Sequence, residues 1–341
     1  MSLPKTYKKA AFKEKGGSLV LEDVELKEPS AGQVLIKVEA CGVCHSDSFA
    51  QGDAFGAGFP MSPGHEIIGR VVAVGPKVED WKVGDRVGGA WHGGHDGTCH
   101  ACKQGFYQMC DNEAVNGVTR DGGYAEYSYL RHEATVRIPE HVDAVKYAPI
   151  LCAGLTVFNG IRQQHLMPGS TVAIQGLGGL GHLALQYAAK SGYRTIALSR
   201  DARKEKFARD LGAHEYIDGS KGDTAEQLQK LGGANMIVCT APDPKLIAPL
   251  LKGLATQGKL LILASAGEIP FDTITMIGKG LTVCAWPSGH ARDAEEAVVF
   301  TELQDINCMV EKFPLEKANE AYNHMMEGKA RFRAVLVPGL A

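Results

Sequence analysis

The feature that most limits the possible folds is a glycine cluster between an apolar run and a helical one. Residues 171–175 (TVAIQ) have the composition of a buried strand, and residues 182–188 (HLALQYA) are helical in pattern. The loop between them reads Gly176-Leu177-Gly178-Gly179-Leu180-Gly181. In this context the G-x-G-x-x-G spacing lets the backbone approach a pyrophosphate at the start of a helix, where free N–H groups face the anion. The alternative is a glycine-rich turn selected only for tight packing.

Strands and helices continue to alternate after this loop. Residues 194–198, 236–240 and 259–263 read as further parallel strands, with amphipathic helices between them. This alternation predicts an α/β, doubly wound parallel sheet, and Thr240 and Ser265, near two strand ends, should line its cofactor groove.

The end of the strand at residues 194–198 bears on the choice of nucleotide. NAD enzymes usually place an acidic residue there to bind the ribose hydroxyls. This chain has Ser199 and Arg200, which can bind a 2′-phosphate, and Arg203 or Lys204 adds positive charge nearby. The strand end therefore predicts NADP(H) rather than NAD(H). An alignment shift of two residues would put Asp201 in the acidic position and reverse the prediction.

The first part of the chain has a different pattern. Short β-rich runs at residues 18–21, 33–38 and 67–74 are separated by turns, and many of the 41 glycines lie between such runs. No helical stretch of useful length competes with them, so this region is predicted to be all-β.

Potential metal ligands gather in and after this region. Cys44 offers a thiolate, His65 an imidazole and Glu66 a carboxylate, and Cys152 is our choice for a further ligand. Two sulfurs and one nitrogen suit zinc, and three protein ligands leave one tetrahedral position for water or substrate, as in catalytic zinc sites. Taken singly, each cysteine could instead be a small buried residue and His65 a core histidine.

The composition excludes several classes of protein. With 341 residues, of which 45% are apolar, the chain is long enough for two domains. A net charge of −3 without a long basic run excludes an electrostatic footprint for nucleic acid. We found no signal peptide or membrane-length apolar run, so a cytoplasmic protein without membrane contact is expected. An odd count of nine cysteines favours metal ligation in a reducing compartment, with Cys239, Cys284 and Cys308 as packing residues.

The stretches Cys44-His45-Ser46-Asp47 and Gly64-His65-Glu66-Ile67-Ile68-Gly69 resemble the zinc-containing medium-chain alcohol dehydrogenases. The resemblance runs over nearly the whole chain, with the motifs in the family's order. It implies a GroES-like β-barrel catalytic domain (residues 1–153 and 304–341) and a Rossmann cofactor domain (residues 154–303), with Cys152 at their junction. It also implies a homodimer or homotetramer.

The resemblance also assigns roles to single residues. Ser46 matches the hydroxyl that shuttles the substrate proton, His45 matches a residue that faces the pyrophosphate, and Thr156 and Arg333 match cofactor contacts; a solvated strand charge is the alternative for Arg333. Phe49 and Gly52 stand where many relatives have the next histidine of the proton relay. The positions that wall the substrate pocket in relatives are occupied by Phe55, Trp91 and Trp286. They imply a bulky apolar or aromatic substrate, with ordinary core packing as the alternative.

The family commonly holds a second, structural zinc in a cysteine-rich lobe. Cys99, Cys102 and Cys110 match three of its four ligands, and Asp96 stands near the expected place of the fourth. A carboxylate can complete such a site. A metal-free loop is the alternative, and His92, His95 and His100 are possible substitutes for Asp96.

Together these features predict a zinc-dependent alcohol dehydrogenase or aldehyde reductase that transfers a hydride between a primary alcohol or aldehyde and NADP(H). Glu66 is either a direct ligand or a nearby charge. One alternative is a zinc-free quinone or enone reductase of the same fold, which would lack the cysteine and histidine ligands. Another is a non-catalytic protein that binds zinc or nucleotide.

Overall fold

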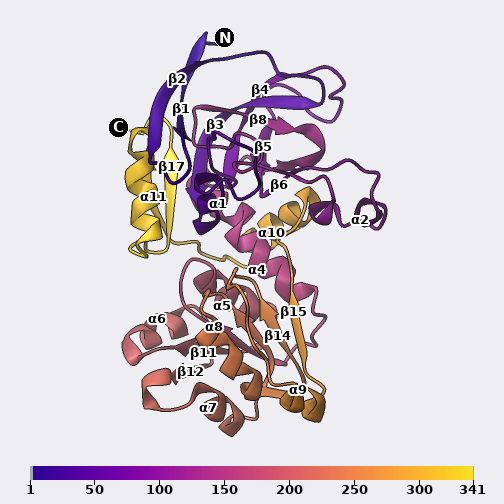
Figure 1. Cartoon of the computed structure of the whole chain (residues 1–341), viewed down its shortest axis with the longest axis vertical. Helices are drawn as coiled ribbons and strands as arrows, with labels where there is room; N and C mark the ends of the chain where they lie inside the picture. The colour runs from indigo at the N-terminus through magenta and orange to yellow at the C-terminus, as the bar shows by residue number, and fades with distance from the viewer. Residues whose placement is uncertain (1–2, 341) are drawn as a thin grey trace. The chain divides into compact units, whose positions relative to one another are not determined.

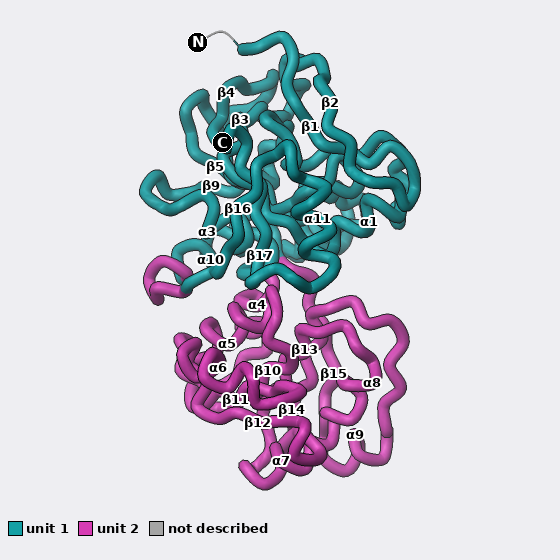
Figure 2. Tube along the Cα trace, turned by 90° about the vertical axis from the view of Figure 1, so that its left-hand side faces the viewer, with its two compact units in different colours: residues 1–155, 289–300, 307–341 teal, residues 156–288, 301–306 magenta. Residues whose placement is uncertain are grey.

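The computed structural model describes residues 3–340, which form two compact units (Figures 1 and 2). The first unit comprises the chain up to Leu155, the segment Gly289–Phe300 and the chain from Asn307 onward. The second comprises Thr156–Ser288 and Thr301–Ile306. Each unit has a buried apolar core of its own.

The first unit is built on a seven-stranded sheet in the order β16-β17-β3-β4-β5-β9, with β8 paired to β3. Its strands are β3 (Gln33–Val43), β4 (Ile67–Val74), β5 (Arg86–Gly89), β8 (Tyr127–Arg131), β9 (Thr135–Arg137), β16 (Val310–Pro314) and β17 (Arg333–Val337). Two smaller sheets pair β1 (Thr6–Phe12) with β2 (Leu19–Glu25), and β6 (His92–Gly94) with β7 (Ala114–Val115). This is the β-rich region that the sequence pattern predicted and the GroES-like domain that the family resemblance implied.

Helices in this unit are mostly short. They are α1 (Ser48–Gln51), α2 (His100–Lys103), α3 (Ala144–Tyr147) and α11 (Ala318–Met326), with the 3-10 turns η1 (His45–Asp47), η2 (Tyr107–Met109), η3 (His132–Ala134), η4 (Ala148–Leu151) and η8 (Leu315–Lys317). Two further helices, α4 (Ala153–Arg162) and α10 (Ala291–Leu303), each contribute residues to both units.

The last strand returns to this unit as predicted. β17 pairs antiparallel with β3, with Leu336 opposite Cys41 and Ala334 opposite Val43. This register brings Arg333 next to the end of β3, just before Cys44.

The second unit is a six-stranded sheet in the order β12-β11-β10-β13-β14-β15, and every neighbouring pair is parallel. The strands are β10 (Thr171–Gln175), β11 (Arg194–Ser199), β12 (Glu215–Asp218), β13 (Ala234–Cys239), β14 (Leu254–Ile262) and β15 (Thr282–Ala285). The connecting helices are α5 (Gly181–Lys190), α6 (Glu205–Asp210), α7 (Thr224–Lys230), α8 (Pro244–Ile247) and α9 (Thr273–Lys279), with the turns η5 (Ala202–Lys204), η6 (Gly219–Lys221) and η7 (Ala248–Gly253). The strand order is that of a doubly wound Rossmann sheet, which confirms the predicted fold class.

In residues 3–340, no single helix combines the length and hydrophobicity needed to cross a bilayer, although the bent pair Ala144–Leu151 and Ala153–Arg162 meets both criteria when taken together.

Candidate metal centre and nucleotide loop

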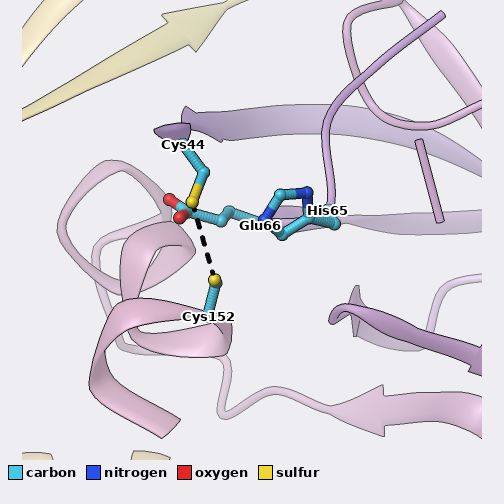
Figure 3. A group of neighbouring side chains, drawn as sticks. All are labelled: Cys44, His65, Glu66 and Cys152. Atoms are coloured by element: carbon cyan, nitrogen blue, oxygen red, sulfur yellow. Dashed lines mark hydrogen bonds between the residues drawn. The ribbon is translucent and has the colours of Figure 1, made fainter. Parts of the chain in front are cut away.

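Strand pairing brings the first ligand candidates together. β3 and β4 are antiparallel, with Cys41 opposite Ile67, and the Gly42 amide donates to the Glu66 carbonyl at 3.0 Å. Cys44 lies just past the end of β3, and His65 and Glu66 lie just before β4. The register therefore sets these three side chains side by side. Cys152 joins them from the break between η4 and α4 (Figure 3).

The four side chains form a compact group of donor atoms. One ligand atom from each of Cys44, His65, Glu66 and Cys152 lies within 4.8 Å of the others. The two sulfurs are 3.9 Å apart, and all the side chains except that of Cys152 are buried. Buried donors this close are expected to bind a cation or to share protons.

Electrostatics at this group favours a cation. The hydrogen bond with Cys152 holds the pKa of the Cys44 thiol well below its ordinary value, which favours the thiolate that binds metals. Burial lowers the pKa of His65, but Asp47 and Cys44 together raise it well above its ordinary value. An imidazole between two anionic groups attracts positive charge, either a proton or a metal ion.

The Asp47 carboxylate faces the imidazole of His65. The carboxylate is fully buried, and Oδ1 lies 3.2 Å from His65 Nδ1 without the alignment of a hydrogen bond. Within the described residues, His65 Nε2 is buried and has no hydrogen-bond partner. This arrangement, with a carboxylate behind one nitrogen and the other nitrogen available, is typical of metal-bound histidines.

Glu66 has two different oxygen environments. Oε1 accepts from Nη2 of Arg333, while Oε2 is buried and has no partner among residues 3–340. Arg333 is itself only 4% exposed. The alternative that Arg333 is a solvated strand charge is therefore wrong, because its guanidinium is buried and pairs with Glu66.

An aromatic ring packs on His65, and two further rings pack on that ring. The Trp91 ring meets the imidazole edge to face at 4.9 Å, and Phe49, Phe55 and Trp91 form a triangle of ring contacts 6.0–6.4 Å apart. Phe55 is 55% exposed, so core packing does not explain it. Trp286, the remaining predicted wall residue, follows β15 in the second unit.

The predicted proton-shuttle hydroxyl is close in sequence to the first residue of the group. Ser46 is half-buried in η1, two residues after Cys44, and His45 is exposed in the same turn. Phe49, at the next relay position of many relatives, lies in the aromatic triangle and offers no group that could carry a proton.

The second cluster is also assembled. One ligand atom from each of Asp96, Cys99, Cys102 and Cys110 lies within 4.8 Å of the others. Asp96 Oδ1 accepts from the amides of Thr98 and Cys99, and its Oδ2 accepts from Asn112 at 2.6 Å. The Asn112 bond, with these amide bonds, lowers the pKa of Asp96 and keeps it an anion.

The histidines proposed as substitutes for Asp96 are not part of this cluster in the described chain. His95 Nδ1 lies 3.2 Å from His92 Nε2, and the His95 ring stacks on Tyr107 at 4.2 Å. His100 is exposed at the start of α2. Asp96 is thus the residue that accompanies the three cysteines.

The glycine loop connects β10 to α5, as predicted. Gly176 has φ +87°, and a Cβ on Gly181 would lie 1.8 Å from the Gly176 carbonyl oxygen, so both positions require glycine for the turn itself. A Cβ on Gly178, in contrast, would meet no described heavy atom within 4 Å. Internal packing does not explain that glycine, and the open space agrees with the prediction that a phosphate approaches the backbone there.

Two of the predicted cofactor residues contact this loop or the strand before it. Lys204 Nζ donates to the Leu177 carbonyl at 2.7 Å, and Thr240 Oγ1 lies 2.8 and 3.0 Å from the carbonyl oxygens of Gln175 and Gly176. Thr156 is buried in α4, and Ser265 is exposed after β14.

At the end of β11, Ser199 is half-buried and Arg200 is exposed. Asp201, the residue that could reverse the nucleotide prediction, is engaged elsewhere. It accepts from the Arg203 amide at 2.9 Å and pairs with the Arg203 guanidinium at 2.6 Å. These bonds hold its carboxylate against its own turn.

Sequence reasoning missed two functional neighbours. Asp47 was visible as an acid three residues after Cys44, and that spacing could have marked it as a partner of the ligands. Tyr124 donates to Asp47 Oδ2 at 2.8 Å from 77 residues away, and no sequence signal points to it.

Comparisons with known proteins agree with this architecture. Residues 30–140 match the alcohol dehydrogenase GroES-like domain, and residues 179–302 match the zinc-binding dehydrogenase domain. The chain is 63% identical over 333 residues to alcohol dehydrogenase patD of Penicillium expansum, with 98% of each chain covered.

Two solved structures are similar over nearly the whole chain. Acetophenone reductase from Geotrichum candidum, in complex with NAD, superposes with a TM-score of 0.86 at 26% identity, covering 99% of this chain and 98% of the other. The CAD protein of Helicobacter pylori, complexed with NADP(H), gives 0.84 at 25% identity, covering 98% and 99%.

A GroES-like domain joined to a Rossmann sheet with an intact glycine loop defines a medium-chain dehydrogenase. With the identity to alcohol dehydrogenases over its full length, the chain belongs to the zinc-containing medium-chain alcohol dehydrogenase family. It is an alcohol dehydrogenase and acts on small-molecule substrates.

Proposed function

We propose that this protein is a zinc-dependent alcohol dehydrogenase that transfers a hydride between a primary alcohol or aldehyde and NADP(H). The observation that carries the proposal is the donor group of Cys44, His65, Glu66 and Cys152. Two sulfurs and an imidazole are ligands that zinc prefers. His65 Nε2, buried and without a hydrogen-bond partner in residues 3–340, fits a metal ligand. A zinc-free reductase of this fold would have no need of that set.

Zinc held by these residues would supply a Lewis acid that favours ionisation of an alcohol and polarises an aldehyde. The chain's own groups have complementary tasks. Asp47 orients His65, and Arg333 balances the charge of Glu66. We assign Ser46 the substrate proton, because its hydroxyl can accept one proton while donating another.

The proposed substrate class follows from the aromatic triangle. The Trp91 ring packs on His65, Phe49 and Phe55 contact the Trp91 ring, and Phe55 is largely exposed rather than used in the core. Such a wall favours a bulky apolar or aromatic primary alcohol or aldehyde over a small polar one.

NADP(H) is the nucleotide that the strand end of β11 favours. The similar solved structures carry NAD in one case and NADP(H) in another, so the choice depends on this chain's own residues. Ser199 and Arg200 offer a hydroxyl and a cation for a 2′-phosphate. The Arg203 guanidinium hydrogen-bonds to the Asp201 carboxylate. The nearest acid is therefore not free to bind the ribose hydroxyls of NAD(H).

We propose a second zinc in the lobe, held by Asp96, Cys99, Cys102 and Cys110. Three sulfurs and one carboxylate oxygen form a closed donor set, which suits a structural rather than a catalytic ion. Asn112 supports the site by holding the Asp96 carboxylate. We further propose that the protein is cytoplasmic and forms a homodimer or homotetramer. Light scattering of the purified protein would test the oligomeric state.

The test of the reaction is Cys44→Ala, assayed by NADPH oxidation with benzaldehyde. Turnover should be lost while NADPH binding, followed by nucleotide fluorescence, persists, because the glycine loop is in the other unit. Cys41→Ala is the matched control, since Cys41 is an equally buried thiol outside the donor group and should keep its activity. Full turnover in Cys44→Ala would reject the proposal.

A further inference from the structure

The carboxylate of Asp47 is held from three separate segments of the chain. Oδ2 accepts from the Cys44 amide at 2.9 Å, and Oδ1 accepts from the Gly64 amide at 3.2 Å and faces His65 Nδ1. The two amides and the imidazole belong to the two stretches that carry ligands. The third hydrogen-bond donor, the Tyr124 hydroxyl, comes from outside them and bonds to Oδ2 at 2.8 Å.

Tyr124 is built into the core at this point. Its side chain is fully buried, and it precedes β8. The ring packs against Gly64, where an added Cβ would lie 2.6 Å from Tyr124 Cδ1. Ring and hydroxyl therefore do different things: the ring fills space beside the residue that precedes His65, and the hydroxyl contacts Asp47.

The hydroxyl bond bears on the imidazole through the carboxylate. A carboxylate behind a ligand histidine fixes the ring and sets how basic the metal-binding nitrogen is. With two donors on Oδ2, rotation of the Asp47 carboxylate away from His65 would break two hydrogen bonds in a buried site, where unpaired polar groups are costly.

We propose that Tyr124 is a positioning residue that locks Asp47 against His65 and so slows loss of the metal ion from the Cys44–His65–Cys152 centre. This inference rests on the proposed zinc site. It assigns Tyr124 no contact with substrate or nucleotide.

The test is the rate at which the purified protein releases zinc to an excess of the chromogenic chelator 4-(2-pyridylazo)resorcinol. Zinc can leave from two proposed sites. The kinetic phase of zinc release that is absent in Cys44→Ala belongs to the Cys44–His65–Cys152 centre and not to the cysteine-rich lobe. Tyr124→Phe keeps the ring beside Gly64 and deletes only the hydroxyl, and should speed that phase about tenfold, the lower end of what such outer partners contribute. Thermal melting checks that the variant is folded.

Tyr322→Phe is the matched control. Tyr322 is buried in the same core and donates to Gln51 Oε1 at 2.9 Å, without a bond to Asp47. It should release zinc at the wild-type rate. Asp47→Asn should release zinc faster than wild type, and adding Tyr124→Phe to it should change little, because both act through one carboxylate.

The inference would be overturned if Tyr124→Phe released zinc at the wild-type rate, or if Tyr322→Phe sped release equally. Additive effects of Asp47→Asn and Tyr124→Phe in the double variant would also overturn it. If Tyr124→Phe does not fold, the comparison of Asp47→Asn with wild type decides, and an unchanged rate there rejects the role of Asp47 and Tyr124 together. If wild-type protein releases no more zinc than Cys44→Ala, the proposed zinc function itself is rejected.

Discussion

Arg200→Asp tests the choice of nucleotide most sharply. The substitution removes a cation from the end of β11 and puts an acid where NAD enzymes usually have one. A charge-assisted hydrogen bond contributes about 1.5–3 kcal/mol, which corresponds to a roughly 10- to 150-fold fall in kcat/KM for NADPH. Because Arg200 is exposed, the lower half of that range is expected. The kcat/KM for NADH should rise, since its ribose hydroxyls gain an acceptor.

The assay is the ratio of kcat/KM for NADPH and NADH with one aldehyde, and Arg203→Ala is the control. Arg203 is 84% exposed and paired with Asp201, so its loss should change the ratio by less than about fivefold. An unchanged ratio in Arg200→Asp would refute the assignment. A shift toward NADH in Arg203→Ala would show that Asp201, once released, occupies the acidic position.

Three further predictions concern other parts of the chain. Gly178→Ala should melt like wild type but bind NADPH more weakly, whereas Gly181→Ala should be strongly destabilised by contact with the Gly176 carbonyl; equal stability of the two variants would contradict this. Asp96→Asn should lower the zinc content by one atom per chain and leave the Cys44 centre loaded, as metal analysis would measure; two atoms per chain would exclude Asp96 as a ligand. Burial, with the charges of neighbouring histidines and Arg131, lowers the pKa of His92 from 6.5 to about 3, so below pH 6.5 only the unfolded chain takes up that proton. The free energy of unfolding should therefore fall between pH 7.5 and 5 by about 2 kcal/mol more in wild type than in His92→Gln. Urea unfolding at both pH values would measure this, and equal losses in the two proteins would contradict the prediction.

Much of the architecture was readable from the sequence because local pattern and tertiary structure agree. β10, the glycine loop and α5 follow one another as the strand, G-x-G-x-x-G and helix signals required. The grouping of Cys44 with His65 and Glu66 also has a simple origin, since an antiparallel pair places the residue after one strand beside the residues before the next.

Other features depended on contacts that no local pattern encodes. Tyr124 meets Asp47 across 77 residues, and Asn112 holds Asp96 across 16. The orientation of the Asp47 and Asp96 carboxylates in the two donor clusters therefore depends on these distant partners. Asp201 is a local contrast, because its partner Arg203 is only two residues away in the same turn.

Arg333 is the clearest case of tertiary context overriding sequence appearance. An arginine at the start of a short strand near the end of the chain usually reads as a solvated charge. β17 pairs with β3, however, and this carries Arg333 into the buried surroundings of Glu66. Whether it also contacts the nucleotide stays a prediction.

The central claim is that buried sulfur and imidazole donors hold an ion on which the reaction depends. The most direct measurement is the zinc content per chain of purified, active protein, compared with that of Cys44→Ala. The account predicts two atoms in the first and one in the second, with activity only in the first. Active protein that contains no zinc, or a Cys44→Ala variant that keeps both atoms, would contradict it.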